Sequence, residues 1–256
     1  MRIATWNVNS IRQREGHVQR WLEKARADVL FLQEIKCETA SFPVLAFHGL
    51  GYMAEAVGQK SYNGVAVLSR LPFTVVHRAL PGLPQDDLQA RYIEIETGGI
   101  ALIGIYLPNG NSRGDEGFAY KLAWMDRLAD RAQVLLDADR PVVITGDFNV
   151  CPTDADYAPG ALSPVDALVR LESRQRFRRL LWMGLTDAVR TMHPHEPAYT
   201  FWDYQAGAWQ RDLGLRIDHA LLSPGLAERL VSADPDRAER DQPQPSDHVP
   251  VMVDIR

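Results

Sequence analysis

Asp247 and His248 lie side by side in a proline-bounded segment, residues 245–250, just before an apolar tail typical of a strand. An imidazole titrates near neutral pH, so it can transfer a proton or donate a hydrogen bond to a phosphate oxygen. The alternative is a surface histidine in a loop. Other polar clusters also follow apolar runs, and this repetition favours a functional site over unrelated turns.

Asn7, Glu34, Tyr106 and Asp147 each stand directly after a short apolar run. Each has an ordinary explanation by itself: a turn residue, a rim charge, a core aromatic or a turn after a strand. Together with His248, their oxygens suit a hard divalent cation next to an acid/base group. The sequence therefore predicts a metal site where several strands end.

Asp147 and Asn149 are two positions apart, so in extended geometry their side chains point to the same face. One side chain can then activate a water molecule while the other holds that water or its target. The alternative is a tight turn, because Gly-Asp and Asn are common turn residues.

Asp218 stands at the mouth of an otherwise apolar run, residues 217–222. A carboxylate that is buried there without a partner is costly. A nearby imidazole would pair with it and would be held in one tautomer. A surface ion pair with Arg216 is the alternative.

A second group of residues is suited to contact a substrate. Exposed aromatics beside a metal site, such as Phe201 and Trp202, can stack on or wedge against nucleotides, with Leu215 nearby. The alternative is core packing for at least one of the two aromatics. Arg91 and the arginine-rich run 170–179 are candidates for phosphate contacts, although a solvated helix face is the simpler explanation of that run.

The elements that must position these residues are mostly short strands. Segments rich in Val and Ile and bounded by Gly or Pro predict strands at 2–8, 29–33, 51–56, 64–69, 73–78, 90–96, 100–106, 142–146, 198–202, 216–222 and 249–255. The residues proposed for the metal site close their strands. Asp218 and His248 instead begin theirs, as they must if those strands run antiparallel and open at the same edge.

Three helices are predicted. Ser10, with Gln13 three residues later, forms a capping-box pattern at the start of the first. The second covers about 117–137, with Lys121 off its buried stripe, and a third is expected around 172–183. So many strands and so few helices favour an α/β (α+β) fold, a four-layer α/β/β/α sandwich of two packed mixed β-sheets flanked by helices.

Bulk properties narrow the classes of protein. The 256 residues, 46% of them apolar, suit a packed globule, and without a linker segment we expect one domain over 1–256. No run of 18 apolar residues and no signal peptide is seen, and the two cysteines, Cys37 and Cys151, are expected to be reduced in a cytoplasmic protein. A formal charge of −5 argues against a protein that coats nucleic acid but not against a nuclease.

Taken together, the segments resemble the exonuclease III family of AP endonucleases, in the endonuclease/exonuclease/phosphatase superfamily. The resemblance runs in family order from residue 1 to about 255, and its combination of motifs is specific. The matching pieces are Trp6–Ser10, Leu32–Lys36, Gly51–Tyr52, Tyr62–Ala66, Tyr106–Gly110, Gly146–Asn149, Pro152–Asp154, Tyr199–Asp203, Arg216–Asp218 and Ser246–His248.

The resemblance implies a deoxyribonuclease I-like fold and a monomeric enzyme that uses Mg²⁺ or Mn²⁺. Its substrate would be double-stranded DNA with abasic sites or damaged 3′ ends, cut during base excision repair. The implied catalytic residues are Tyr106, Asp147, Asn149, Asp218 and His248. The implied metal neighbourhood comprises Asn7, Glu34, Asp147, Asn149, Asp247 and His248. The implied substrate contacts are Arg91, Asn109, Phe201, Trp202 and Leu215.

Several positions depart from the family pattern. Leu215 is of the bacterial type, Asn109 stands where some bacterial members have Gln, and the 156–174 segment is short and idiosyncratic. The balance between abasic-site cleavage and 3′ exonuclease activity therefore stays open. Two alternatives remain as well: a superfamily phosphatase that acts on a small molecule, and a catalytically silent binding module on the same scaffold.

Overall fold

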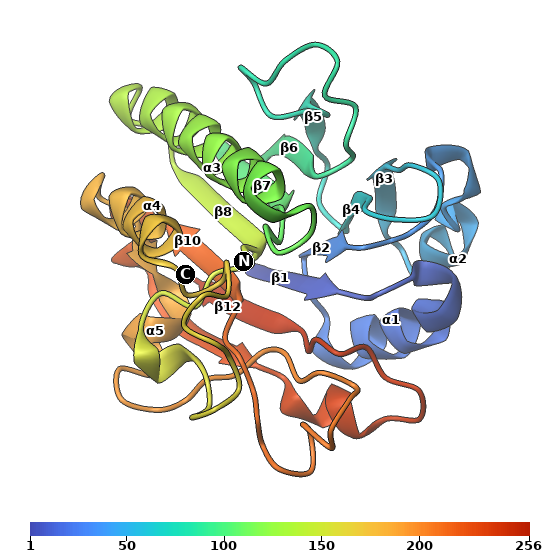
Figure 1. The fold of residues 1–256 in the computed structure, drawn as a ribbon. Coiled ribbons are helices and arrows are strands. Elements are labelled where there is room, and N and C mark those ends of the chain that lie inside the picture. The colour runs from blue at the N-terminus through green and yellow to red at the C-terminus, as the bar shows by residue number, and fades with distance from the viewer.

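A computed structural model describes residues 1–256, which form two six-stranded mixed sheets packed face to face (Figure 1). The strands are β1 (Arg2–Asn7), β2 (Val29–Gln33), β3 (Met53–Val57), β4 (Val65–Ser69), β5 (Thr74–His77), β6 (Tyr92–Thr97), β7 (Ile100–Tyr106), β8 (Val142–Asp147), β9 (Thr186–Asp187), β10 (Asp218–Leu222), β11 (Leu230–Pro235) and β12 (Val251–Ile255). The strand order is β11-β12-β1-β2-β4-β3 in one sheet and β5-β6-β7-β8-β10-β9 in the other.

Helices cover the outer face of each sheet, which completes the predicted four layers (Figure 1). The helices are α1 (Ile11–Ala25), α2 (Val44–His48), α3 (Gly114–Asp137), α4 (Leu171–Trp182), α5 (Ala188–Met192) and α6 (Pro224–Ala227), with 3₁₀ turns at Thr39–Ser41, Asp154–Asp156 and Arg237–Asp241. Apolar side chains of α1 and α2 pack on the first sheet, and those of α3 and α4 pack on the second. No helix combines the length and the apolar composition needed to cross a membrane.

The central layer of the core lies between the two sheets. Val, Ile and Leu side chains from the inner faces of both sheets meet there in one continuous cluster. Phe31 of β2 occupies the space above Gly104 of β7, where an added Cβ would lie 2.1 Å from the Phe31 ring. The glycine therefore lets the two sheets approach at this point.

Strand direction brings one end of each sheet to the same edge of the molecule. β1 and β2 run parallel in the first sheet, and β7 and β8 run parallel in the second. β12 is antiparallel to β1, and β10 is antiparallel to β8. The carboxyl ends of the parallel strands and the start of β10 thus share one edge, as predicted.

Most predicted strands are present, but three differences matter. The predicted strand at 198–202 is absent. In that segment Phe201 forms only isolated β-bridges, one to Leu215 and one to His248. β9 and β11 were not predicted. β9 has only two residues, and β11 is an edge strand in which Ala233 alone is buried, so neither carries a clear apolar pattern.

The predicted capping box at the start of α1 is wrong. Ser10 has φ 92° and its side chain caps no backbone group. The backbone N–H groups of Ser10 and Ile11 instead donate to the carbonyls of Glu34 and Ile35, at 2.7 and 3.1 Å. The segment after β2 therefore satisfies the helix start that a side chain was expected to cap.

The predicted face of α3 is wrong at one position. Lys121 was expected off the buried stripe, yet its side chain has no exposed surface. Its ammonium lies among backbone carbonyls of three loops and not in solvent. The apolar pattern of a helix does not anticipate such a lysine, because lysine is almost never fully buried.

Candidate active site

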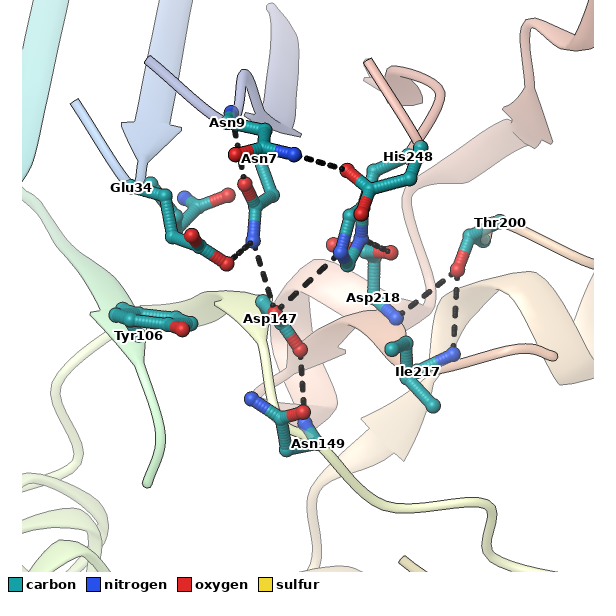
Figure 2. Close-up of polar contacts among 12 residues, drawn as sticks. Asn7, Asn9, Glu34, Tyr106, Asp147, Asn149, Thr200, Ile217, Asp218 and His248 are labelled. Atoms are coloured by element: carbon teal, nitrogen blue, oxygen red, sulfur yellow. Dashed lines mark hydrogen bonds and ion pairs between the residues drawn. The ribbon is translucent and has the colours of Figure 1, made fainter. Parts of the chain in front are cut away.

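Three titratable side chains meet where the two sheets share an edge (Figure 2). Glu34 follows β2, Asp147 ends β8 and His248 precedes β12. One ligand atom from each lies within 4.8 Å of the other two. Residues that are more than two hundred positions apart in sequence therefore converge on one small volume, as the strand ends predicted.

Asp147 is buried and lies at the centre of this group. Its two carboxylate oxygens accept hydrogen bonds from the backbone N–H of Asn149 at 2.9 Å and from the Asn7 amide at 3.1 Å. Burial raises the pKa of Asp147 to about 7, although the nearby His248 acts in the opposite direction. A carboxyl with such a pKa can accept a proton at neutral pH. Gly146, with φ 144°, precedes it where a Cβ would meet the Ile105 carbonyl oxygen at 2.0 Å.

The Asn7 amide joins the two carboxylates. Its NH₂ group donates to Glu34 at 2.9 Å and to Asp147 at 3.1 Å, and its oxygen accepts from the Asn9 N–H. Burial alone would raise the pKa of Glu34, but Lys36, whose Nζ lies 2.9 Å from a Glu34 oxygen, and the Asn7 amide hold that pKa below its usual value. Glu34 is therefore ionised at neutral pH.

His248 stands between two carboxylates. Its Nδ1 lies 2.8 Å from Asp218 and its Nε2 lies 3.8 Å from Asp147. Burial disfavours the charged ring, but Asp218 and Asp147 outweigh it and raise the pKa of His248 to about 10. The ring is therefore a cation with one N–H fixed on Asp218, and this pairing replaces the alternative Arg216–Asp218 pair. Arg216 binds elsewhere.

Asp218 is fixed through its backbone. The Thr200 hydroxyl accepts from the N–H groups of Ile217 at 3.2 Å and of Asp218 at 3.1 Å (Figure 2). One carboxylate oxygen of Asp218 binds His248, and the other is buried without a hydrogen-bond partner. This role of Thr200 was not predicted from the sequence, because only the aromatic residues of its segment were considered as candidates.

Asn149 reaches the site through a turn, so the expected extended geometry is wrong. β8 ends at Asp147, and Asn149 has φ 49°. The turn nevertheless directs its backbone N–H to Asp147, while its side chain donates to the Leu107 carbonyl at 2.9 Å and accepts from Asn109 at 3.0 Å. Asn109 and Asn149 thus form one hydrogen-bonded unit beside Asp147.

Tyr106 ends β7 on the other side of the site (Figure 2). Burial, with Glu34 and Asp147 close by, raises the pKa of Tyr106 well above its ordinary value. The phenol therefore keeps its proton and is available as a donor. The Arg91 guanidinium lies 4.8 Å from the centre of the Tyr106 ring and donates to the Tyr106 carbonyl at 3.2 Å, so Arg91 borders the site.

The oxygens of Glu34 and Asp147 fit a hard divalent cation. Three carboxylates, Glu34, Asp147 and Asp218, face only two cations: Lys36 pairs with Glu34, and His248 is hydrogen-bonded to Asp218 and lies 3.8 Å from Asp147. Such a donor set suits Mg²⁺ or Mn²⁺. His248 completes the group of three candidate ligands, and the Asn7 amide donates to both carboxylates at the edge of that group.

The remaining predicted residues differ in position. Asp247 accepts from the Asn9 amide at 3.1 Å and does not belong to the three-residue group. Phe201 packs its ring 4.9 Å from that of His248, and it lines with Leu215 a pocket of about 390 Å³. Trp202 is fully buried and donates its indole N–H to Asp212, so its predicted role in substrate stacking is wrong and the core alternative holds.

The arginine-rich run mainly ties α4 to its neighbours. Arg176 and Arg179 pair with Asp126 of α3, and Arg174 pairs with Asp154. The Arg170 guanidinium stacks 3.6 Å from the centre of the Phe118 ring. These contacts favour the interpretation that the run 170–179 is a helix face over the interpretation that its arginines contact phosphates.

The chain is similar over its whole length to known DNA-processing enzymes. Exodeoxyribonuclease III of Haemophilus influenzae is 32% identical over 268 residues, which cover 100% of both chains. A solved Neisseria 3′ phosphatase, bound to a product DNA hairpin, is 39% identical with a TM-score of 0.94, over 100% of this chain and 99% of that chain. An AP endonuclease from Archaeoglobus fulgidus is 37% identical with a TM-score of 0.93, over the same shares.

These neighbours also confirm the expected fold, since structures of AP endonucleases and exonucleases superimpose on nearly the whole chain. The family model for endonuclease/exonuclease/phosphatase proteins matches residues 4–248. This range begins within β1 and ends at His248. With its strand-end site and its full-length relatives, this chain belongs to the endonuclease/exonuclease/phosphatase family, in the exonuclease III and AP endonuclease branch.

Proposed function

We propose that this chain is a Mg²⁺-dependent DNA repair nuclease that cuts double-stranded DNA on the 5′ side of abasic sites and removes nucleotides or blocking groups from 3′ ends. The proposal is carried by Asp147, a buried carboxylate with a pKa of about 7 that is held by two amide donors beside a protonated His248. The products would be a 3′-hydroxyl and a 5′-phosphate.

In this proposal Asp147 takes a proton from the attacking water. A positioned general base contributes typically ~10²–10⁴-fold to the rate. The Asn149 N–H binds one Asp147 oxygen at 2.9 Å. The other Asp147 oxygen accepts from the Asn7 amide and lies 3.8 Å from Nε2 of His248. The turn after β8 therefore sets the direction from which the water is activated.

His248 and Tyr106 supply donors where negative charge gathers. Each keeps its proton at neutral pH, because the pKa of His248 is raised to about 10 and the pKa of Tyr106 is raised well above its ordinary value. The loss of one such donor typically costs ~10²–10³-fold in rate. Asp218 holds the His248 ring at 2.8 Å and so keeps its other nitrogen directed at the site.

Glu34 and Asp147 would hold the cation, which supplies positive charge to the phosphoryl group and the departing 3′ oxygen. Phe201 and Leu215 would line the pocket for a sugar without its base. Turning a nucleotide out of the duplex is easiest when its base is missing. Recognition would depend on backbone contacts more than on base sequence.

Two further expectations belong to this proposal. A monomeric enzyme stays a prediction from the family resemblance. A cytoplasmic location stays a prediction from the sequence, and the sequence leaves the cation as Mg²⁺ or Mn²⁺.

The test is cleavage of an end-labelled duplex with one abasic site, in Mg²⁺, in EDTA and after Mg²⁺ is restored. We expect cleavage that stops in EDTA and returns with Mg²⁺, with 3′-hydroxyl ends. A parallel assay uses inositol phosphates. Turnover of those compounds without DNA cleavage would favour the small-molecule phosphatase, and no turnover of either substrate would favour the silent binding module.

A further inference from the structure

Lys121 is a fully buried lysine in the N-terminal half of α3. Its ammonium donates hydrogen bonds to the backbone carbonyls of Asn109 at 3.0 Å, Asn149 at 2.6 Å and Ala167 at 3.2 Å. No carboxylate lies within ion-pair distance of it. A buried charge normally requires a partner, so three carbonyls from three separate loops satisfy this one.

The number of acceptors matches the protonated side chain. An ammonium carries three N–H donors, and each can serve one of the three carbonyls. Burial lowers the pKa of Lys121 to about 7. A neutral amine, with two donors, would leave one carbonyl unpaired, so the three-carbonyl arrangement itself stabilises the charged form.

Two of the three carbonyls belong to residues of the proposed site. The Asn109 side chain donates to the Asn149 side chain at 3.0 Å, and the Asn149 backbone N–H holds Asp147 at 2.9 Å. Lys121 therefore binds the backbone of Asn149, whose N–H group reaches the base, and the backbone of Asn109, whose side chain reaches Asn149. Two hydrogen bonds separate the ammonium from Asp147.

The loop after β7 is folded directly against the lysine. Gly110 has φ 89°, and an added Cβ there would lie 2.7 Å from Cδ of Lys121. The third loop is tied to the first, because Asn111 accepts from the Ala167 N–H at 2.8 Å. The contacts thus form a closed unit around the lysine stem and its ammonium.

We propose that Lys121 is a positioning residue, whose ammonium clamps the loops after β7 and β8 to the 166–168 segment and so holds Asn109 and Asn149 against Asp147. The proposal rests on the proposed function only in taking Asp147 as the base. A lysine that merely fills the core would affect stability without a selective effect on the chemical step.

The first test is Lys121→Met, which keeps the length of the stem and removes the three donors. We expect kcat on the abasic duplex in saturating Mg²⁺ to fall at least ~10-fold with little change in KM, because a small misplacement of a reacting group is costly. Hydrogen exchange supplies a readout that is independent of activity. The amides of Asn111 and Cys151 are hydrogen-bonded within the clamped loops and should exchange faster.

Leu128→Ala is the matched control, since Leu128 is buried on the same helix and belongs to the apolar core. It should lower stability while leaving kcat and both amide exchange rates near wild type. The proposal is overturned if Lys121→Met keeps wild-type kcat, if its exchange rates do not change, or if Leu128→Ala shows the same selective loss of kcat.

Gly110→Ala tests the same clamp by a change in the loop after β7 instead of in the lysine. It provides the test of the proposal if Lys121→Met does not fold. It leaves the ammonium in place and presses a methyl group on the lysine stem, so kcat should fall and the Asn111 amide should exchange faster. The double variant should lose no more kcat than the worse single variant, and independent losses would count against a shared clamp. Inactive wild-type protein would refute the proposed function, while the exchange comparison would still test the clamp.

Discussion

Asp147 and Asp156 are both buried aspartates, yet their surroundings are opposite. Asp156 accepts from Arg216 and from Arg190, each at 2.6 Å. Burial alone would raise its pKa, but the two guanidinium groups outweigh burial and lower the pKa of Asp156 far below its usual value. Asp147 has only amide donors and a more distant imidazolium, and its pKa is raised to about 7.

The difference shows two uses of a buried carboxylate. Asp156 is neutralised by arginines and stabilises the fold, whereas Asp147 is not neutralised and is available for catalysis. Arg216 also binds Asp187 at 2.8 Å and lies 3.0 Å from Nδ1 of His219. This network fixes the 3₁₀ turn, α5 and the start of β10 to each other. At the catalytic edge a carboxylate lacks such a partner, so a cation and a proton remain to be bound there.

The largest expected effect follows from removing the charge at the catalytic edge. Asp147→Asn should lower kcat by at least ~10²–10⁴-fold, the usual contribution of a general base, because it also removes an oxygen ligand of the cation. The free energy of unfolding at pH 8 should be unchanged or higher, because the raised pKa means that the ionised carboxylate destabilises the native state as pH rises through about 7. Single-turnover kinetics and urea denaturation check the two halves. Wild-type kcat would reject Asp147 as the base.

The same substitution in the paired region should have the opposite profile. Asp156→Asn takes one carboxylate partner from the buried Arg216 and from the partly buried Arg190, and breaking a buried ion pair typically costs ~3–5 kcal/mol of stability. Activity per folded molecule should stay near wild type. A stability loss in Asp147→Asn as large as that in Asp156→Asn, both measured by urea denaturation, would break the comparison between the two regions.

Metal binding should stabilise the protein through the catalytic edge alone. At a Mg²⁺ concentration 100 times its Kd, a single site stabilises the native state by ~2.7 kcal/mol. The rise in Tm should disappear in Glu34→Gln and persist in Asp156→Asn. Thermal scans with Mg²⁺ and with EDTA test this, and a full Tm rise in Glu34→Gln would place the ion elsewhere.

A smaller effect, a shift of the pH dependence of kcat, is expected when Asp218, the partner of His248, is changed. The raised pKa of His248, about 10, means that its proton is present below that pH and is lost above it, so activity should fall on the alkaline side. Asp218 makes the largest favourable contribution to that pKa, and Asp218→Asn should move the alkaline limb to lower pH. An unmoved limb in a pH–kcat profile would separate that limb from His248.

The catalytic edge was predictable because strand ends are visible in a sequence. Glu34, Tyr106 and Asp147 directly follow apolar runs, and the direction of β10 and β12 follows from where Asp218 and His248 stand. The pairing itself was less visible. Whether His248 binds a metal ion or holds a proton depends on two carboxylates from other strands, which no local pattern encodes.

The supporting residues were not predictable for the same reason. Lys121 has the sequence environment of an exposed helix residue, yet three loops from distant parts of the chain deliver carbonyls to it. The start of α1 shows a capping-box pattern, but the carbonyls after β2 replace the cap. β11, with one buried side chain, has too little apolar contrast for a pattern to indicate it.

Crystals soaked in Mn²⁺ and measured for anomalous scattering test most directly whether the unpaired charge at the catalytic edge exists to bind a cation. We expect a peak in contact with Glu34 and Asp147, and no peak at the same place in Asp147→Asn. An empty catalytic edge at saturating Mn²⁺, or an ion bound to other carboxylates while the enzyme is active, would contradict it.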